Sequence, residues 1–296
     1  MRAPDHLETA TVNHDENTTL RRPAFALPRG ACDTHCHVLG PVDRFPYAQA
    51  RHYTPHDSDK QVLSAMHARL GVERTVIVQA TVYGTDNRIV LDAIADDPQA
   101  RRGVALIDDT TTDAELEALH AGGMRAARFG FVPRLWTPPE PATLLRLAAR
   151  IAPLGWHLLL HLDATSLDAL QPTLDALPVP FVIDHMGRID VALGVRQAGF
   201  VQLREWARRE HCWVKVSALD RLSAMGAPFI DTAPYVRALL DIAPGRVLWG
   251  TDFPHPNPRH LVHDDADLVD VLPLCGDTQA LHRLLVANPA RLYGFD

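Results

Sequence analysis

The stretch from Thr75 to Ile107 decides the fold, and it reads TVIVQATVYGTDNRIVLDAIADDPQARRGVALI. Its opening residues, Thr75-Val76-Ile77-Val78, form a continuous β-branched run, which suits a strand covered on both faces of a parallel sheet. Asn87–Ala95 has the apolar spacing of a helix, and Gly103–Ile107 is a second short apolar run. A strand, a helix and a strand in this order predict a βαβ unit.

The same alternation continues outward from this stretch in both directions. The predicted strands are Ala31–His37, Thr75–Thr81, Gly103–Ile107, Ala126–Phe129, His157–Leu162, Phe181–His185, Trp213–Ser217 and Arg246–Thr251. The predicted helices are Ser58–Leu70, Asn87–Ala95, Asp113–Ala121, Ala142–Ala152, Leu167–Ala176, Phe200–Arg209, Pro234–Ile242 and Thr278–Ala287. Eight strand–helix units in one chain predict an α/β fold that closes into a (β/α)8 barrel, the TIM barrel, rather than an open sheet.

The chain divides into a short arm and one domain. Residues 1–28 are polar and lack periodicity, so we expect a flexible N-terminal arm. We expect residues 29–296 to form a single barrel domain. The insertion Gly40–Asp57 is rich in proline, aromatic and polar residues and follows the first strand, so we interpret it as an active-site loop.

Composition excludes several classes of function. The chain is 47% hydrophobic and 22% charged, which is ordinary for a globular protein. Its net charge of −7 argues against nonspecific binding to nucleic acid, and no apolar run approaches the roughly 20 residues that span a membrane. Four cysteines without a CxxC pair, and a polar N-terminus, favour a reduced, cytoplasmic protein. A homo-oligomer is left open.

Polar side chains gather at the predicted carboxyl ends of the strands, where barrel enzymes carry their chemistry. They are His35, His37, Gln79, Thr81, Arg128, His161, Asp184, His185, Ser217 and Asp252. A histidine pair with one residue between shares one face of a strand and could ligate one metal, although an isolated pair is more often incidental. Imidazole and carboxylate suit Zn²⁺ or Mn²⁺, and an aspartate at the barrel mouth can take a proton from an attacking water.

The chain resembles the amidohydrolase superfamily, of the amidohydrolase-2 or metal-dependent hydrolase type. The resemblance is carried by Asp33-x-His35-x-His37, Asp184-His185-Met186-Gly187-Arg188, Trp249-Gly250-Thr251-Asp252-Phe253-Pro254-His255-Pro256 and Asn288-Pro289-Ala290-Arg291-Leu292-Tyr293. It extends from Cys32 to Phe295 and is strongest to the branch that contains 2-pyrone-4,6-dicarboxylate lactonase and 4-sulfomuconolactone hydrolase. It implies a distorted barrel of the amidohydrolase type, and a hydrolase that opens a small lactone ring in aromatic-compound catabolism.

The resemblance also implies residues that bind the substrate. They are Tyr53, Thr81, Arg128, Arg134 and Arg221. Arginine stays charged, and its planar fork of donors fits a carboxylate or sulfonate. Three arginines at one mouth therefore predict a small lactone with more than one anionic group, whereas the alternative for any single arginine is a surface salt bridge.

The resemblance does not decide whether the protein binds a metal. The pyrone lactonase of this branch works without a metal and has a tyrosine where this chain has His161, whereas metal-dependent members carry a histidine there. We therefore predict one divalent metal, Zn²⁺ or Mn²⁺. Its predicted ligands are His35, His37, His161 and Asp252. Metal-independent catalysis, as in the branch, is the alternative.

The predicted mechanism assigns Asp252 as the general base and His185 as a stabiliser of the oxyanion. We expect His255 to orient Asp252 indirectly. Three alternatives remain at this point: a metal-dependent decarboxylase of the same superfamily, a sugar-acid lactonase or lactone isomerase, and a non-catalytic acid-binding protein.

Overall fold

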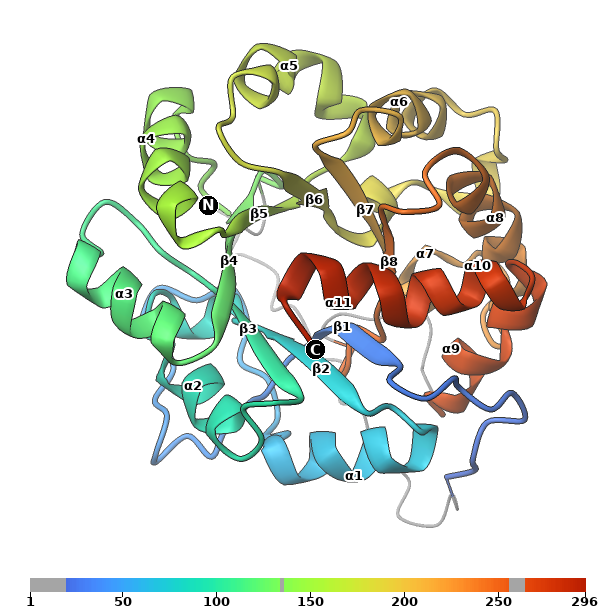
Figure 1. Cartoon of the computed structure of the whole chain (residues 1–296), viewed down its shortest axis with the longest axis horizontal. Helices are drawn as coiled ribbons and strands as arrows, with labels where there is room; N and C mark the ends of the chain where they lie inside the picture. The colour runs from blue at the N-terminus through green and yellow to red at the C-terminus, as the bar shows by residue number, and fades with distance from the viewer. Residues whose placement is uncertain (1–19, 134–135, 256–263) are drawn as a thin grey trace, which may run out of the picture.

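The computed structural model describes residues 20–133, 136–255 and 264–296. Eight parallel strands follow one another in sequence order in a single sheet, and helices surround them (Figure 1). The strands are β1 (Cys32–Cys36), β2 (Arg74–Val78), β3 (Arg101–Ala105), β4 (Met124–Gly130), β5 (His157–His161), β6 (Phe181–Ile183), β7 (Cys212–Val216) and β8 (Val247–Trp249). The predicted distorted (β/α)8 barrel is confirmed.

Helices follow these strands, and most of them form the outer layer of the barrel (Figure 1). They are α1 (Lys60–Leu70), α2 (Arg88–Ala95), α3 (Asp113–Ala121), α4 (Pro141–Ile151), α5 (Leu167–Asp175), α6 (Ala198–Ala207), α7 (Leu219–Leu222), α8 (Ala233–Ile242), α9 (Ala266–Asp270), α10 (Thr278–His282) and α11 (Asn288–Tyr293). The sequence analysis did not predict the short helices α7, α9 and α11. Among the described residues, no helix is long and apolar enough to cross a membrane.

The barrel is least regular where β1 meets β8. Within the described chain, β1 reaches the β8 side through one parallel bridge, between Cys36 and Phe253. The backbone N–H of Asp252 donates to the carbonyl of His35 at 2.7 Å, and that of His37 donates to the carbonyl of Phe253 at 2.7 Å. The segment that follows β8 therefore closes the barrel, and closure places Asp252 beside the two histidines.

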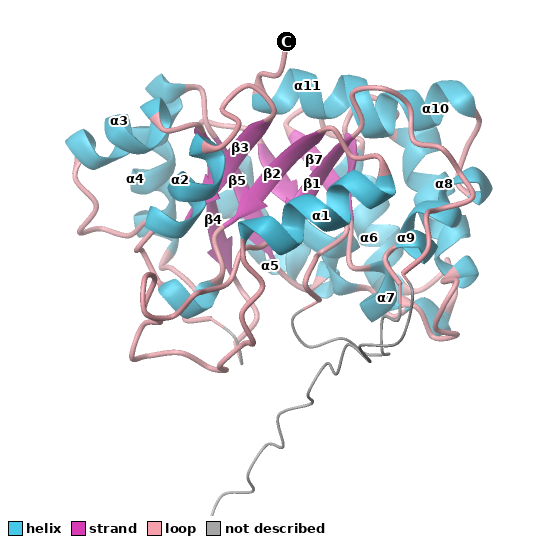
Figure 2. Ribbon diagram, turned by 90° about the horizontal axis from the view of Figure 1, so that it is seen from below, coloured by secondary structure: helices cyan, strands magenta, loops and turns pink. Residues whose placement is uncertain are grey.

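The two ends of the barrel are built differently. The side chains of Tyr293 and Phe295 pack into the core cluster that Cys32, Val76 and other strand residues form, so the C-terminal segment closes the amino end. Figure 2 shows α11 and the C-terminus at that end and α7 at the opposite one. The carboxyl ends of the strands are left as the mouth of the barrel.

The predicted active-site loop is anchored at its base. Leu39 and Ser58 exchange backbone hydrogen bonds of 2.8 and 2.7 Å at the two ends of the insertion. The hydroxyl of Tyr83 accepts a hydrogen bond from the backbone of Gly40 at 2.7 Å. These contacts fix the base of the loop that carries Tyr53.

The predicted arm can be followed only in part, because residues 1–19 lie outside the described residues. From Leu20 onward the arm contacts the barrel. Arg21 bonds to Asp267 and Asp270 at 2.5 Å, and the backbone N–H of Phe25 donates to Asp270 at 2.9 Å. The division into an arm and one domain stays a prediction.

Candidate active site

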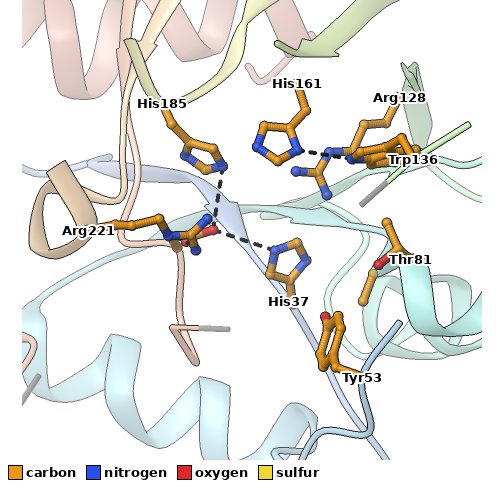
Figure 3. Close-up of a pocket in the computed structure, with 10 residues that line it drawn as sticks. His37, Tyr53, Thr81, Arg128, Trp136, His161, His185 and Arg221 are labelled. Atoms are coloured by element: carbon orange, nitrogen blue, oxygen red, sulfur yellow. Dashed lines mark hydrogen bonds and ion pairs between the residues drawn. The ribbon is translucent and has the colours of Figure 1, made fainter. Parts of the chain in front are cut away.

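A pocket opens at the mouth of the barrel, and side chains from most strand ends line it (Figure 3). The lining residues are His37, Tyr53, Ala80, Thr81, Arg128, Trp136, His161, His185, Arg221 and Asp252. The structure thus brings together most of the predicted site. His35 lies fully buried against Asp252 rather than in the lining, and Arg134 lies outside the described residues.

The two histidines at the carboxyl end of β1, His35 within the strand and His37 just after it, are held in the same tautomer. Nδ1 of His37 bonds to the backbone carbonyl of Val78 at 2.8 Å, so Nδ1 carries the proton. Nδ1 of His35 lies 3.1 Å from Asp184, and we assign its proton to that bond. Burial, with Lys215 nearby, holds the pKa of His35 well below its ordinary value. Both Nε2 lone pairs therefore face Oδ1 of Asp252, at 3.5 and 3.6 Å.

Asp252 follows β8 in a left-handed conformation, with φ at 68°. Its Oδ1 faces His35 and His37, and its Oδ2 contacts the guanidinium of Arg221. Burial alone would raise the pKa of Asp252, but the guanidinium of Arg221 holds it well below its ordinary value. The carboxylate is therefore ionised at the pH of the cell.

His185 lies in the turn after β6, also in a left-handed conformation with φ at 49°. Its Nδ1 bonds to the hydroxyl of Ser217 at 2.8 Å, and its Nε2 lies 3.8 Å from Asp252. Burial holds the pKa of His185 well below its ordinary value, although Asp252 opposes this shift. The imidazole is therefore neutral.

The predicted substrate-binding residues that the structure describes line one pocket. Arg128 is 5% exposed, and its Nη2 lies 3.4 Å from Asp184. Arg221 reaches the pocket from α7. Tyr53 bonds to Thr81, and burial raises the pKa of Tyr53, so its phenol stays protonated. Two guanidinium groups and a phenol thus converge on one small space.

Among the described residues, His35, His37 and Asp252 form a group whose ligand atoms all lie within 4.8 Å of one another. Nε2 of His35 is buried without a hydrogen-bond partner, and both histidines use Nδ1 as a donor, which is the usual arrangement around a bound metal. These residues therefore fit a divalent metal. His161, the fourth predicted ligand, belongs to no such group in the described chain.

Sequence reasoning missed two residues of the site. Trp136 lines the pocket from the segment beyond β4, and nothing in the pattern distinguished it from a loop tryptophan. Lys215 is fully buried on β7 and donates to the carbonyl of Thr34 at 2.8 Å. A lysine within an apolar strand was a signal that could have been used, because a buried lysine needs partners.

A barrel whose mouth gathers histidines and an ionised aspartate, with three of these groups spaced for one metal, has the architecture of a barrel hydrolase. The chain belongs to the amidohydrolase family, whose model matches residues 32–295. The predicted family is confirmed.

Similar proteins cover almost the same length. A 2-pyrone-4,6-dicarboxylate hydrolase of Comamonas testosteroni is 44% identical, over 92% of this chain and 92% of its own. A 4-sulfomuconolactone hydrolase of Rhizobium radiobacter is 38% identical, also over 92% of each chain. A structure from Acinetobacter baumannii, described as a probable 2-pyrone-4,6-dicarboxylic acid hydrolase and holding citric acid, is 25% identical. Its TM-score is 0.78, over 90% of this chain and 100% of that chain.

Proposed function

We propose that this protein hydrolyses a small lactone that carries two or more anionic groups, of the pyrone dicarboxylate or muconolactone type, in the breakdown of aromatic compounds. One observation carries the proposal: an ionised carboxylate, Asp252, shares a small pocket with two arginines. The carboxylate supplies a base, and the arginines supply sites for anions. The similar proteins act on lactones of this type by their names, and the similar structure holds a polycarboxylate.

In this mechanism Asp252 carries a proton from the attacking water to the leaving oxygen. Its carboxylate takes a proton from a water as that water attacks the lactone carbonyl. The bond between the carbonyl carbon and the ring oxygen then breaks, and Asp252 returns the proton to the leaving oxygen. We assign to His185, which is neutral and bonded to Ser217 with its Nε2 3.8 Å from Asp252, the stabilisation of charge on the carbonyl oxygen.

The anionic groups of the substrate are held by the cationic wall of the pocket. Arg128 is fixed through Asp184 and Arg221 lies beside Asp252, so the two mark out separate anion sites. Tyr53 and Thr81 add hydroxyl groups on the remaining side (Figure 3). Arg134 is proposed for the same role, although it lies outside the described residues. Fixed anions align the carbonyl with the base.

We also propose one divalent metal, Zn²⁺ or Mn²⁺, which His35, His37 and Asp252 would hold. Such an ion supplies a Lewis acid and lowers the pKa of a bound water. Metal analysis of protein purified without chelator tests this. Full activity in protein that holds no metal would show that the metal is dispensable.

The experiment for the function itself is a lactone panel on wild-type protein and Asp252→Asn. The panel contains pyrone dicarboxylates, muconolactone carboxylates and aldonolactones. We expect Asp252→Asn to lower kcat by about a thousandfold or more and to leave substrate binding within a few-fold. Asp109→Asn, at an exposed position, is the matched control. An Asp252→Asn variant that keeps most of its activity would remove the role proposed for this residue.

The same panel separates the alternatives. A decarboxylase releases carbon dioxide without opening a ring, and a sugar-acid lactonase or isomerase prefers aldonolactones. A non-catalytic acid-binding protein gains thermal stability from the ligand without turnover. A cytoplasmic location is proposed on the four cysteines, which are all buried and free of disulfides.

A further inference from the structure

Trp136 reaches into the pocket and contacts two of its polar side chains. Its indole Nε1 donates a hydrogen bond to Nδ1 of His161 at 3.0 Å, which Figure 3 marks with a dashed line. Its ring also faces the guanidinium of Arg128, whose Cζ lies 5.5 Å from the ring centroid. The indole therefore joins the ends of two neighbouring strands.

The end of β4 provides the surface on which this indole packs. The ring packs on Gly130, the last residue of β4, where a Cβ atom would collide with it. Gly130 pairs in register with His161 on β5, and the backbone N–H of Trp136 donates to the carbonyl of Val132 at 3.0 Å. The indole that packs on the end of β4 thus contacts the imidazole of His161 at the end of β5.

The bond from Trp136 decides where the proton of His161 lies. An indole nitrogen can only donate, so Nδ1 of His161 must be the nitrogen without a proton, and Nε2 must carry it. Nε2 is buried and has no hydrogen-bond partner among the described residues. It points to the side of the pocket on which His185 lies (Figure 3).

This arrangement is the reverse of that at His35 and His37. Those histidines donate from Nδ1 to Asp184 and to the carbonyl of Val78, which leaves each Nε2 with a lone pair for a metal. His161 accepts at Nδ1 and so presents a proton at Nε2. A protonated nitrogen cannot ligate a metal, but it can donate to an oxygen.

We propose that Trp136 is a positioning residue that fixes His161 as a hydrogen-bond donor to the lactone carbonyl oxygen, rather than as a metal ligand. The inference rests on the proposed lactone hydrolysis. The unpartnered N–H finds its acceptor when the substrate arrives, and the bond strengthens as the carbonyl oxygen becomes negative. Its effect therefore falls on kcat more than on KM.

The tautomer is measured by ¹⁵N-detected NMR of the histidine side chains, without turnover and without metal. In wild-type protein we expect a pyridine-like Nδ1 and a pyrrole-like Nε2 at His161. Trp136→Phe removes the donor, and Gly130→Ala adds a Cβ that would displace the indole. Both should remove this fixed pattern. Both should lower kcat about fivefold to tenfold, the worth of one hydrogen bond, with KM within about twofold.

The chain offers a matched control. Nε1 of Trp156 donates to Nδ1 of His120 at 3.0 Å, and neither residue lines the pocket. Trp156→Phe should therefore change the spectrum of His120 and leave that of His161 and kcat unchanged. If Trp156→Phe lowered kcat as much as Trp136→Phe, the effect would be one of general packing, and the assignment would fall.

A zinc titration separates a donor from a ligand. His161→Ala should lower kcat about a hundredfold, as loss of an oxyanion donor does, and bind Zn²⁺ as wild type does, whereas His35→Ala should lose Zn²⁺. A pyrrole-like Nδ1 in wild-type protein, or loss of Zn²⁺ from His161→Ala, would overturn the proposal. Protein with the expected tautomer that opens no lactone would contradict the proposed function and not the assigned tautomer.

Discussion

The buried imidazole of His255 allows a quantitative test of how the site is held. Its Nε2 lies 2.7 Å from Asp265, and its Nδ1 lies 3.5 Å from Asp220. Burial alone would lower the pKa of His255, but the two carboxylates raise it well above the ordinary 6.5. The backbone N–H of His255 also donates to the carbonyl of Asp252 at 2.8 Å. A charged imidazolium thus ties α7 and α9 to the turn that carries Asp252.

Replacing His255 by glutamine removes the imidazolium from between two buried carboxylates, of which Asp265 keeps Arg69 at 3.6 Å. Removal of one partner from a buried ion pair costs about 3 to 5 kcal/mol. With about 2.1 cal/mol/K per residue, the unfolding entropy of a 296-residue chain is roughly 0.6 kcal/mol/K. His255→Gln should therefore lower Tm by about 5 to 8 °C near neutral pH.

The loss should depend on pH in a defined direction. Because the folded pKa of His255 is raised above its ordinary value of 6.5, its contribution to stability is complete below that value. The contribution is lost as the pH rises through the folded pKa. At the acid end the pKa of Asp265 is lowered, so its contribution is lost as the pH falls through that folded value.

Thermal unfolding across a pH series, by calorimetry or intrinsic fluorescence, is the assay. The gap in Tm between wild type and His255→Gln should be widest near neutral pH and shrink as the solution becomes alkaline. His282→Gln, on the exposed face of α10, is the control and should match wild type throughout. A gap that stays constant to alkaline pH would show that it does not arise from a titrating His255 and would refute this reasoning.

Three further perturbations follow from the same contacts. Tyr53→Phe should raise KM about fivefold to tenfold with little change in kcat, because it removes a hydroxyl from the anion pocket; steady-state kinetics with Tyr47→Phe as control measure this. Arg221→Met removes the cation that lowers the pKa of Asp252. In a plot of kcat against pH, the acid limb should therefore move to higher pH, and an unmoved limb would exclude Asp252 as the group that titrates there. Asp33→Asn should cost about 2 to 3 kcal/mol of stability in denaturant unfolding, because Asp33 accepts from Thr251 at 2.6 Å and from the backbone of His35 at 3.0 Å; a smaller loss than that of Asp109→Asn would contradict this.

The barrel could be predicted because its strands are apolar runs that repeat between amphipathic helices. The helix Asp113–Ala121 has the predicted bounds, and a capping box of Thr112 and Glu115 begins it. The prediction of β3 began two residues late, because Arg101 and Arg102 interrupt the apolar pattern. Both are nevertheless paired in register with Thr75 and Val76 on β2. Charged residues at a strand end can belong to the sheet through their backbone while their side chains bond elsewhere, as Arg102 does to the carbonyl of Gly294 at 2.7 Å.

The site could be predicted as far as strand ends determine it. Arg128, His161 and His185 were found in this way, because parallel strands in a barrel bring their carboxyl ends together. The turn at His185, with its positive φ, could not be predicted, and the expected strand ended two residues too late there. Trp136 could not be found at all, since its position depends on a glycine in the neighbouring strand end and on contacts within a loop.

Barrel closure and the site are parts of one structure. Asp33 accepts from Thr251, the carbonyl of His35 accepts from Asp252, and the carbonyl of Phe253 accepts from His37. The two segments meet so closely that a Cβ on Gly250 would lie 2.7 Å from the backbone nitrogen of His35.

These backbone contacts between β1 and the segment after β8 fix the distance between the carboxylate of Asp252 and the two imidazoles. A fully regular β8 would hold Asp252 in an extended conformation, whereas φ at 68° directs it back toward β1. We infer that the distortion of the barrel at β8 is what allows the base and the histidine pair to share one site.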